Sequence, residues 1–235
     1  MGIGEFFDDN ADFYNQDLLN YDYDFMEFIK YKNNFNVNIL DIGGGNGNFS
    51  KLVIQNCPNA NITILDPSEK LLSKVNDPKI NKVIGKLPND IPLELKFDFI
   101  HIKEVLHHIT GNTISKSRKL VKKSLNNLKS FLNDEGFLLI HELYYEGFLI
   151  PNFPNYLLFY LLKLQNMLNV KIPAKEFILD LYIYFYTRNE LEIMLNECGF
   201  RIIDYKIDKF SNNMQKKLML LKDWGRILII AKKDI

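Results

Sequence analysis

Apolar and polar positions follow two alternating spacings along most of the chain. Short apolar runs bounded by turn residues predict buried strands, which we place at residues 37–42, 62–66, 80–84, 97–103, 137–143, 200–207 and 224–231. Apolar residues spaced three and four apart predict amphipathic helices, which we place at residues 15–32, 48–57, 113–132 and 187–198. This alternation favours a doubly wound α/β fold, in which helices cover both faces of a mostly parallel sheet. The last two strands lack a full helical crossover, so they favour an antiparallel hairpin at one edge.

Residues that start and stop helices support several of these boundaries. Thr113 is placed to cap a long helix, and Thr187 with Glu190 has the spacing of a capping box. Gly199 is placed to end the helix that this box opens. The run N-D-E-G at residues 133–136 predicts a turn into the strand that follows.

Residues 144–186 interrupt the alternation of strands and helices. This stretch is rich in tyrosine, phenylalanine and leucine, and it follows the fifth predicted strand. It therefore begins at the carboxyl edge of the sheet, where ligands bind in such folds. We expect a largely helical cap over the substrate side of a pocket. The alternative is an apolar face that packs on the core or forms a homodimer contact, and both can hold together.

The most informative segment is the turn D-I-G-G-G-N-G at residues 41–47, between a predicted strand and a predicted helix. Its glycines permit positive φ and let a ligand approach bare backbone, and the helix start presents free N–H groups. The spacing does not match the G-x-G-x-x-G pattern of dinucleotide sites. Asp41 would repel a pyrophosphate but suit an ammonium group, and Asp66 is placed to bind a ribose diol. The pattern predicts a phosphate-free ligand with a ribose and a cationic amino-acid tail.

With these residues the chain resembles the class I S-adenosylmethionine-dependent methyltransferases of the small-molecule type. The matching segments, in the family's order, are residues 40–47, 64–67, 97–108, 136–140 and 187–200. The resemblance covers most of residues 35–235 and implies a seven-stranded sheet in the order 3-2-1-4-5-7-6. We expect residues 35–235 to form the methyltransferase domain, including the cap at 144–186. Residues 1–34 would form a helical segment that covers the cofactor site.

The resemblance also implies how the cofactor S-adenosylmethionine binds. Its methionine part would be held by Asp41 and by the backbone of Gly43 and Gly45. Its ribose hydroxyls would bind Asp66, because burying a carboxylate at the end of an apolar strand costs free energy unless the carboxylate has a hydrogen-bond partner. Pro67 would flank the adenine. For Asp41 the alternative is a carboxylate that caps the turn without touching the cofactor.

The adenine contacts depart from the family pattern. Many members place an acidic residue after the third strand to bind the adenine amine, whereas this chain has Lys86 there. Lysine has no acceptor for that hydrogen bond. We therefore expect the backbone of Lys86 and Leu87, or Asp90 after a rearrangement, to bind adenine instead. Lys103, which ends the fourth strand, completes the expected set of cofactor-binding residues.

Candidates for acceptor chemistry lie at two strand ends and near the N-terminus. His107 stands where some small-molecule O-methyltransferases keep a histidine that deprotonates a hydroxyl; packing or a substrate hydrogen bond is the alternative role. We expect His108, and either His141 or Glu142, to bind a polar substrate group, since an alternating strand turns only one of that pair inwards. Tyr14 would cover the cofactor, with an ordinary core position as the alternative.

Composition and charge narrow the class of partner. Lys+Arg and Asp+Glu number 29 each, so the overall field favours neither nucleic acid nor an anionic membrane. Cys57 and Cys198 are isolated, which disfavours a disulfide framework or a zinc site, and we expect no metal. The first residues lack a signal-peptide pattern, and no apolar stretch of membrane-spanning length is free of charges. We expect a cytoplasmic protein with a small-molecule substrate.

The sequence therefore predicts a methyltransferase that acts on a small, partly apolar acceptor, by O- or C-methylation. The fourth strand lacks an Asn-Pro-Pro-aromatic run, which argues against methylation of planar amino groups. A catalytically silent module that binds the cofactor or regulates a partner is the alternative, and Lys86 favours it. A nicotinamide-dependent oxidoreductase is disfavoured by the glycine spacing and by Asp41.

Overall fold

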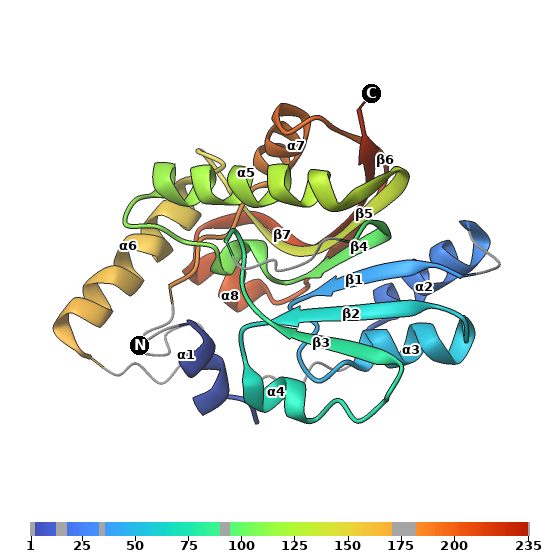
Figure 1. Cartoon of the computed structure of the whole chain (residues 1–235). Coiled ribbons are helices and arrows are strands. Elements are labelled where there is room, and N and C mark those ends of the chain that lie inside the picture. The colour runs from blue at the N-terminus through green and yellow to red at the C-terminus, as the bar shows by residue number, and fades with distance from the viewer. Residues whose placement is uncertain (1–2, 13–17, 33–35, 90–94, 171–181, 235) are drawn as a thin grey trace.

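Seven strands form one twisted sheet in the computed structural model, in the order β3-β2-β1-β4-β5-β7-β6 (Figure 1). The strands are β1 Asn38–Ile42, β2 Asn61–Asp66, β3 Ile80–Ile84, β4 Phe97–Lys103, β5 Leu132–Gly147, β6 Phe200–Lys209 and β7 Leu221–Lys233. All neighbours pair in parallel except β7, which is antiparallel to both β5 and β6. The predicted order and the antiparallel edge are confirmed. The structure describes residues 3–12, 18–32, 36–89, 95–170 and 182–234.

Helices cover both faces of the sheet, as Figure 1 shows. On one face lie α2 Asn20–Lys32 and α3 Asn48–Asn56, and on the other lie α5 Ile114–Phe131 and α7 Arg188–Glu197. The central strand β1 is apolar on both sides because both sides are covered. Leu40 and Ile42 pack in the cluster beneath α5 and α7, whereas Ile39 packs in the cluster with α2 and α3.

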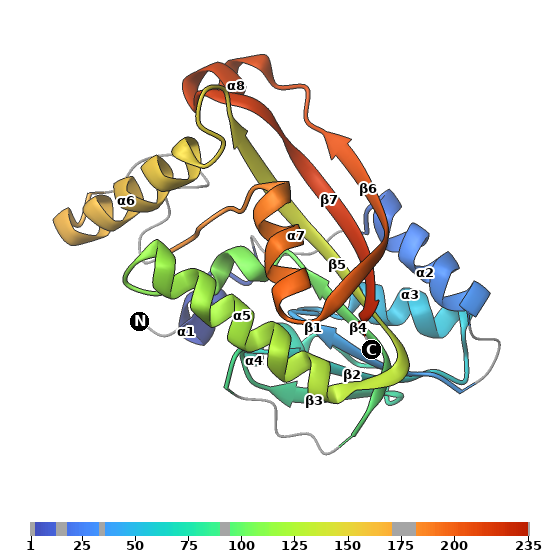
Figure 2. The same cartoon turned by 90° about the horizontal axis from the view of Figure 1, so that it is seen from above.

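The remaining helices lie near the carboxyl edge of the sheet. They are α1 Ile3–Asp9, α4 Glu69–Ser73, α6 Phe153–Leu168, α8 Asn213–Leu218 and the single 3-10 turn Leu106–His108. Figure 2 shows α6 projecting from the body of the molecule, with α8 beside the long antiparallel strands. Within the described part of the chain, no helix is long and apolar enough to cross a membrane.

Local signals set most helix boundaries. Thr113 caps α5 by accepting the N–H of Lys116, and Thr187 forms the predicted capping box with Glu190 at the start of α7. The predicted turn at 133–136 is wrong, because those residues belong to β5. Leu132 already pairs with Phe97 of β4, and an irregularity in the pairing absorbs the extra residues before the regular ladder begins.

The aromatic segment 144–186 contains both strand and helix. Its first four residues continue β5, and α6 follows after a short loop. After residues that lie outside the described part, the chain returns in extended form, and Tyr186 bridges Tyr144. The N–H of Tyr184 donates to the carbonyl of His107 at 2.9 Å. This returning strand therefore lies against the end of β4, where the predicted site is located.

Candidate functional site

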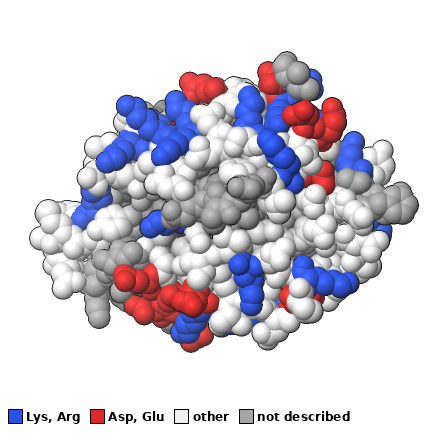
Figure 3. All heavy atoms as spheres, viewed as in Figure 1, with Lys and Arg blue, Asp and Glu red and all other residues white. Residues whose placement is uncertain are grey.

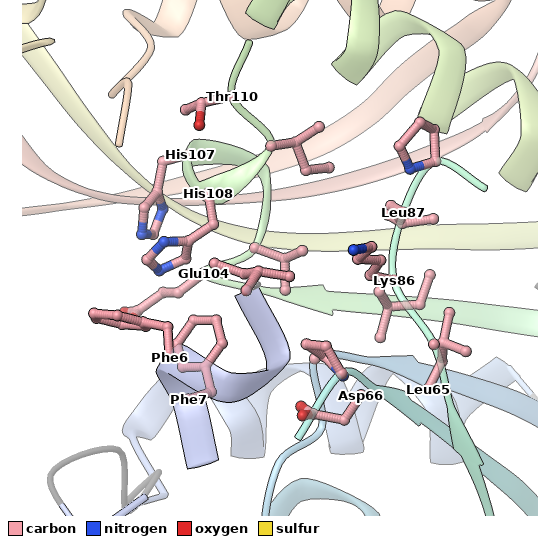
Figure 4. Close-up of a pocket in the computed structure, with 18 of the residues that line it drawn as sticks. Phe6, Phe7, Leu65, Asp66, Lys86, Leu87, Glu104, His107, His108 and Thr110 are labelled. Atoms are coloured by element: carbon pink, nitrogen blue, oxygen red, sulfur yellow. The ribbon is translucent and has the colours of Figure 1, made fainter. Parts of the chain in front are cut away.

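A cavity of about 620 Å³ opens at the carboxyl ends of the central strands. This volume lies within the roughly 300–1,000 Å³ of typical small-molecule sites. Its walls come from the glycine turn after β1, the ends of β2 and β4, the loop after β3, and α1. Figure 4 shows Asp66, Lys86 and Leu87 at one end and His107, His108, Phe6 and Phe7 at the other. The sheet edge thus brings residues from distant parts of the sequence to one cavity.

The glycine turn forms a wall of bare backbone. Gly43, Gly45 and Gly47 have φ of 69°, 50° and 75°, in the left-handed region that favours glycine. A Cβ on Gly43 would lie 2.3 Å from a methyl group of Val105, so a side chain there would displace the end of β4. The close approach of these two segments therefore requires glycine, and it leaves Gly43 lining the cavity.

Asp66 presents a buried carboxylate to the cavity, although two backbone groups already bind it. Its Oδ2 accepts the N–H of Gly45 at 2.9 Å, and its Oδ1 accepts the N–H of Ser68 at 2.8 Å. Burial raises the pKa of this carboxyl to about 6, although the two N–H donors favour the charged form. Each carboxylate oxygen can accept a second hydrogen bond, so Asp66 can still bind a pair of hydroxyl groups.

Asp41 does not line the cavity. Its Oδ1 lies 2.9 Å from Nδ1 of His101, and its Oδ2 accepts the hydroxyl of Ser50 at 2.6 Å. The carboxylate therefore ties the turn to β4 and α3, and direct contact with a ligand ammonium stays a prediction. Gly45 also lies behind the wall, where its N–H orients Asp66.

Apolar surfaces flank the Asp66 end of the cavity. Pro67, Lys86 and Leu87 all line it, and the side chain of Leu87 is buried. Leu65 and Leu71 add further apolar surface on the same side. These groups can sandwich a flat ring without a charged partner. Asp90, the alternative adenine contact, lies outside the described residues.

Lys103 lines the cavity and forms a buried ion pair. Its Nζ donates to Oδ2 of Asp22 at 2.7 Å, and both side chains are almost fully buried. Asp22 belongs to α2, so this pair fastens the helix to the end of β4. Lys103 was an expected cofactor-binding residue, whereas no sequence pattern indicated Asp22, which lies 81 residues away in the chain.

His107 and Glu142 form a buried pair at the other end of the cavity. Nδ1 of His107 lies 2.5 Å from Oε1 of Glu142, and Oε2 of Glu142 accepts the N–H of Leu106 at 2.8 Å. Burial lowers the pKa of His107, but the charge and hydrogen bond of Glu142 outweigh it, so the pKa lies above 6.5. With Nδ1 engaged by the carboxylate, Nε2 is the nitrogen that can meet a ligand in the cavity.

The remaining histidines have different surroundings. His108 lines the cavity beside His107, and burial together with the His107 charge lowers its pKa well below 6.5. His141 is fully buried on the opposite side of the sheet from Glu142, and its ring lies 5.4 Å from that of Tyr21. Burial, Lys103 and Arg226 lower its pKa well below 6.5. Neither residue of the strand pair lines the cavity, and Glu142 acts there through its contact with His107.

The cover of the cavity comes from α1. Phe6 and Phe7 line the cavity, and the ring of Phe7 packs edge-on against His108 at 5.3 Å. Asp8 anchors α1 by accepting the Ser68 hydroxyl at 2.5 Å and the N–H of Lys70 at 3.0 Å. Sequence analysis missed these residues, although two adjacent aromatics near the N-terminus were a usable signal. Tyr14 lies outside the described residues.

Two residues of the expected cap line the cavity. Among the described residues of segment 144–186, these are Tyr182 and Ile183, and no residue of α6 lines it. Glu104, which was not among the expected site residues, also lines the cavity and has a positive φ of 53°. Nε of Arg226 donates to its Oε1 at 3.3 Å. Among the described residues, no group of three or more His, Cys, Asp or Glu is arranged to hold a metal ion.

Comparison with protein families gives one match over most of the chain. A family model described as a methyltransferase domain matches residues 14–205. No curated protein sequence matches the chain.

Several solved structures share the fold at low sequence identity. Magnesium protoporphyrin IX methyltransferase (ChlM) from Synechocystis, with bound SAH, has a TM-score of 0.63 and 12% identity; the match covers 98% of this chain and 97% of that one. An S-adenosylmethionine-dependent methyltransferase from Clostridium acetobutylicum has a TM-score of 0.60 and 18% identity, covering 92% and 93%. Mitomycin 7-O-methyltransferase MmcR has a TM-score of 0.55 and 14% identity; the match covers 84% of this chain but 49% of MmcR.

Proposed function

The chain belongs to the methyltransferase-domain family, and we propose that it transfers the methyl group of S-adenosylmethionine to a small, partly apolar acceptor. One observation carries this proposal. A single cavity joins a buried carboxylate beside bare glycine backbone to an apolar chamber that holds two histidines. The first end suits a phosphate-free nucleoside, and the second suits an acceptor with one polar group.

The residues at the first end fit S-adenosylmethionine. Asp66 retains acceptor capacity for the two ribose hydroxyls, and Pro67 and Leu87 offer apolar surfaces to the adenine. Gly43 lines the cavity with bare backbone, so the methionine part can lie against it. Bound there, the cofactor supplies an electrophilic methyl group on a sulfonium. The protein's part is to position an acceptor in line with that methyl group, and positioning supplies much of the rate.

The residues at the second end favour a hydroxyl acceptor, and hence O-methylation. Neutral His107 can take a proton at Nε2 while Nδ1 donates to Glu142, and the carboxylate stabilises the charged ring that results. Phe6, Phe7 and Ile183 surround this position with apolar surface. A hydroxyl on a flat or lipid-like molecule matches both properties.

The pKa values of the two adjacent histidines should differ in a measurable way. We expect NMR titration of the free protein to show His107 changing charge above pH 6.5 and His108 staying neutral to well below it. The variant Glu142→Gln should lower the pKa of His107, since it removes the charge that raises it. As a matched control, Glu135→Gln alters an exposed glutamate whose partner is Lys232 and should change neither histidine. If the pKa of His107 were the same in Glu142→Gln as in the unaltered chain, the proposed pairing of His107 with Glu142 would be wrong.

Calorimetric titration tests the proposed cofactor directly. We expect S-adenosylmethionine and S-adenosylhomocysteine to bind with 1:1 stoichiometry, and reduced nicotinamide cofactor not to bind. A panel of phenols and long-chain hydroxy compounds, assayed for S-adenosylhomocysteine release, then tests the acceptor class. Cofactor binding without release from any acceptor class would favour the silent module. Absence of cofactor binding would refute the proposed function.

A further inference from the structure

The outward face of α6 is apolar. Leu158 and Leu162 on its inner face are buried against the body of the molecule. Large side chains on its outer face are 41–75% exposed: Phe153, Leu157, Tyr160, Leu161, Leu164, Met167 and Leu168. A helix that is apolar all round is normally covered all round. In Figure 3 the end of the molecule where α6 lies is mostly white, with a few blue side chains.

An apolar tip lies next to this helix. Phe148, Leu149 and Ile150, in the loop between β5 and α6, are 75%, 88% and 62% exposed. The N–H of Phe148 donates to the carbonyl of Leu220 at 3.3 Å, so the loop lies against the segment that joins α8 to β7. Figure 2 shows this loop beside α8. Leu220 and Leu218 of that segment are also exposed, and we call these five residues the apolar tip.

The two stretches that carry the apolar tip hold charges of one sign. Residues 147–175 and 209–222 contain no Asp or Glu; Glu146 and Asp223 lie just outside them, and Asp223 pairs with Lys209 at 2.9 Å. The described lysines in these two stretches are Lys163, Lys209, Lys216, Lys217 and Lys222. The net charge of the whole chain is zero, so this end of the molecule is locally basic. In Figure 3 acidic side chains gather over α1 instead.

We propose that the apolar tip and the outer face of α6 dock on an anionic lipid bilayer. Exposed aromatic and aliphatic side chains beside lysines are the combination that binds the interfacial region of such a membrane. A second copy of the chain fits this surface less well, because a two-fold contact would bring the same lysines of both copies together.

Strand β5 connects the docking surface to the proposed acceptor site. Leu143 of β5 lines the cavity, and Phe148 follows five residues later, a distance of about 17 Å in extended chain. Docking would therefore place the acceptor end of the cavity close to the lipid phase. Membrane binding itself does not require cofactor or turnover, so it can be tested separately from the proposed function.

Vesicle co-sedimentation of the full chain tests the proposal. We expect binding to vesicles of 70% phosphatidylcholine and 30% phosphatidylserine, and much weaker binding to pure phosphatidylcholine. The double variant Phe148→Ser with Leu149→Ser should weaken binding by about tenfold or more. Reversing two lysines, Lys216→Glu with Lys217→Glu, should weaken it by at least roughly 30-fold, the effect of losing two lysines near the bilayer.

Matched controls alter similar residues elsewhere. Tyr31→Ser removes an 81% exposed aromatic of α2, and Lys116→Glu with Lys119→Glu reverses two lysines of α5; both should bind like the unaltered chain. The proposal is overturned if anionic vesicles are not bound, or if the tip variants bind as well as the controls. It is also overturned if light scattering shows a dimer that Phe148→Ser with Leu149→Ser converts to a monomer, because the surface would then be an interface between copies.

Discussion

Replacing Asp66 with alanine should lower the affinity for S-adenosylhomocysteine by about 100-fold or more. The buried carboxylate is the acceptor that we assign to both ribose hydroxyls, and a hydrogen bond to a charged group contributes roughly 1.5–3 kcal/mol. Loss of two such bonds corresponds to at least about two orders of magnitude in Kd. Isothermal titration calorimetry at neutral pH measures the change.

The matched control for this variant is Asp98→Ala. Asp98 also accepts two hydrogen bonds, from the N–H of Asn38 at 2.9 Å and from Asn133 at 2.6 Å, but it lies at the amino end of β4. Its removal should leave the affinity for S-adenosylhomocysteine unchanged. If a folded Asp66→Ala protein bound as tightly as this control, the ribose assignment would be wrong.

The same carboxylate makes cofactor affinity depend on pH. Because burial raises the pKa of Asp66 to about 6, the group is ionised at pH 7.5 and becomes protonated as the pH falls through 6. Protonation removes part of its capacity to accept hydrogen bonds from the ribose. Affinity should therefore fall below pH 6 in the unaltered chain, and this fall should be absent in Asp66→Ala.

Replacing Asp22 with alanine should lower the free energy of unfolding by about 3–5 kcal/mol, the usual cost of leaving one partner of a buried ion pair alone. Lys103 would then keep a buried charge without its carboxylate, and α2 would lose its attachment to β4. For a chain of this length such a loss lowers Tm by roughly 10 °C. Urea unfolding followed by circular dichroism, without cofactor, measures the free energy.

A neighbouring residue of α2 provides the control. Asp24 pairs with Lys206 at 2.6 Å, but both side chains are about half exposed, so Asp24→Ala should cost less than about 1 kcal/mol. The double variant Asp22→Leu with Lys103→Met should be more stable than Asp22→Ala, because it removes both charges together. If Asp22→Ala and Asp24→Ala lost equal amounts of unfolding free energy, the buried pair of Asp22 and Lys103 would not stabilise the fold.

Much of the fold was predictable from local pattern. The apolar runs, the capping box at Thr187 and the glycine turn each reflect constraints that act within a few residues. The resemblance then implied the sheet order, which the strand pairing confirms. The turn predicted at 133–136 failed because strand pairing of Leu132 with Phe97 overrides a local turn preference.

The side-chain partners at the site were not predictable in the same way. Asp41 meets His101 from 60 residues away, and Glu142 meets His107 from 35 residues away. Periodicity shows which face of an element is buried but not which polar groups meet there, and the contact with Glu142 is what raises the pKa of His107.

The sequence by itself determined the order of strands and helices, the bare backbone turn and the carboxylate that ends β2, because backbone geometry dictates them locally. The sequence also predicted an N-terminal cover, but only the tertiary structure decided that Phe6 and Phe7 form it, that Asp41 faces inward, and that α6 and the apolar tip remain exposed at a basic end of a neutral chain. Those features depend on which distant surfaces pack together. Packing is a property of the whole folded chain, and short-range patterns do not encode it.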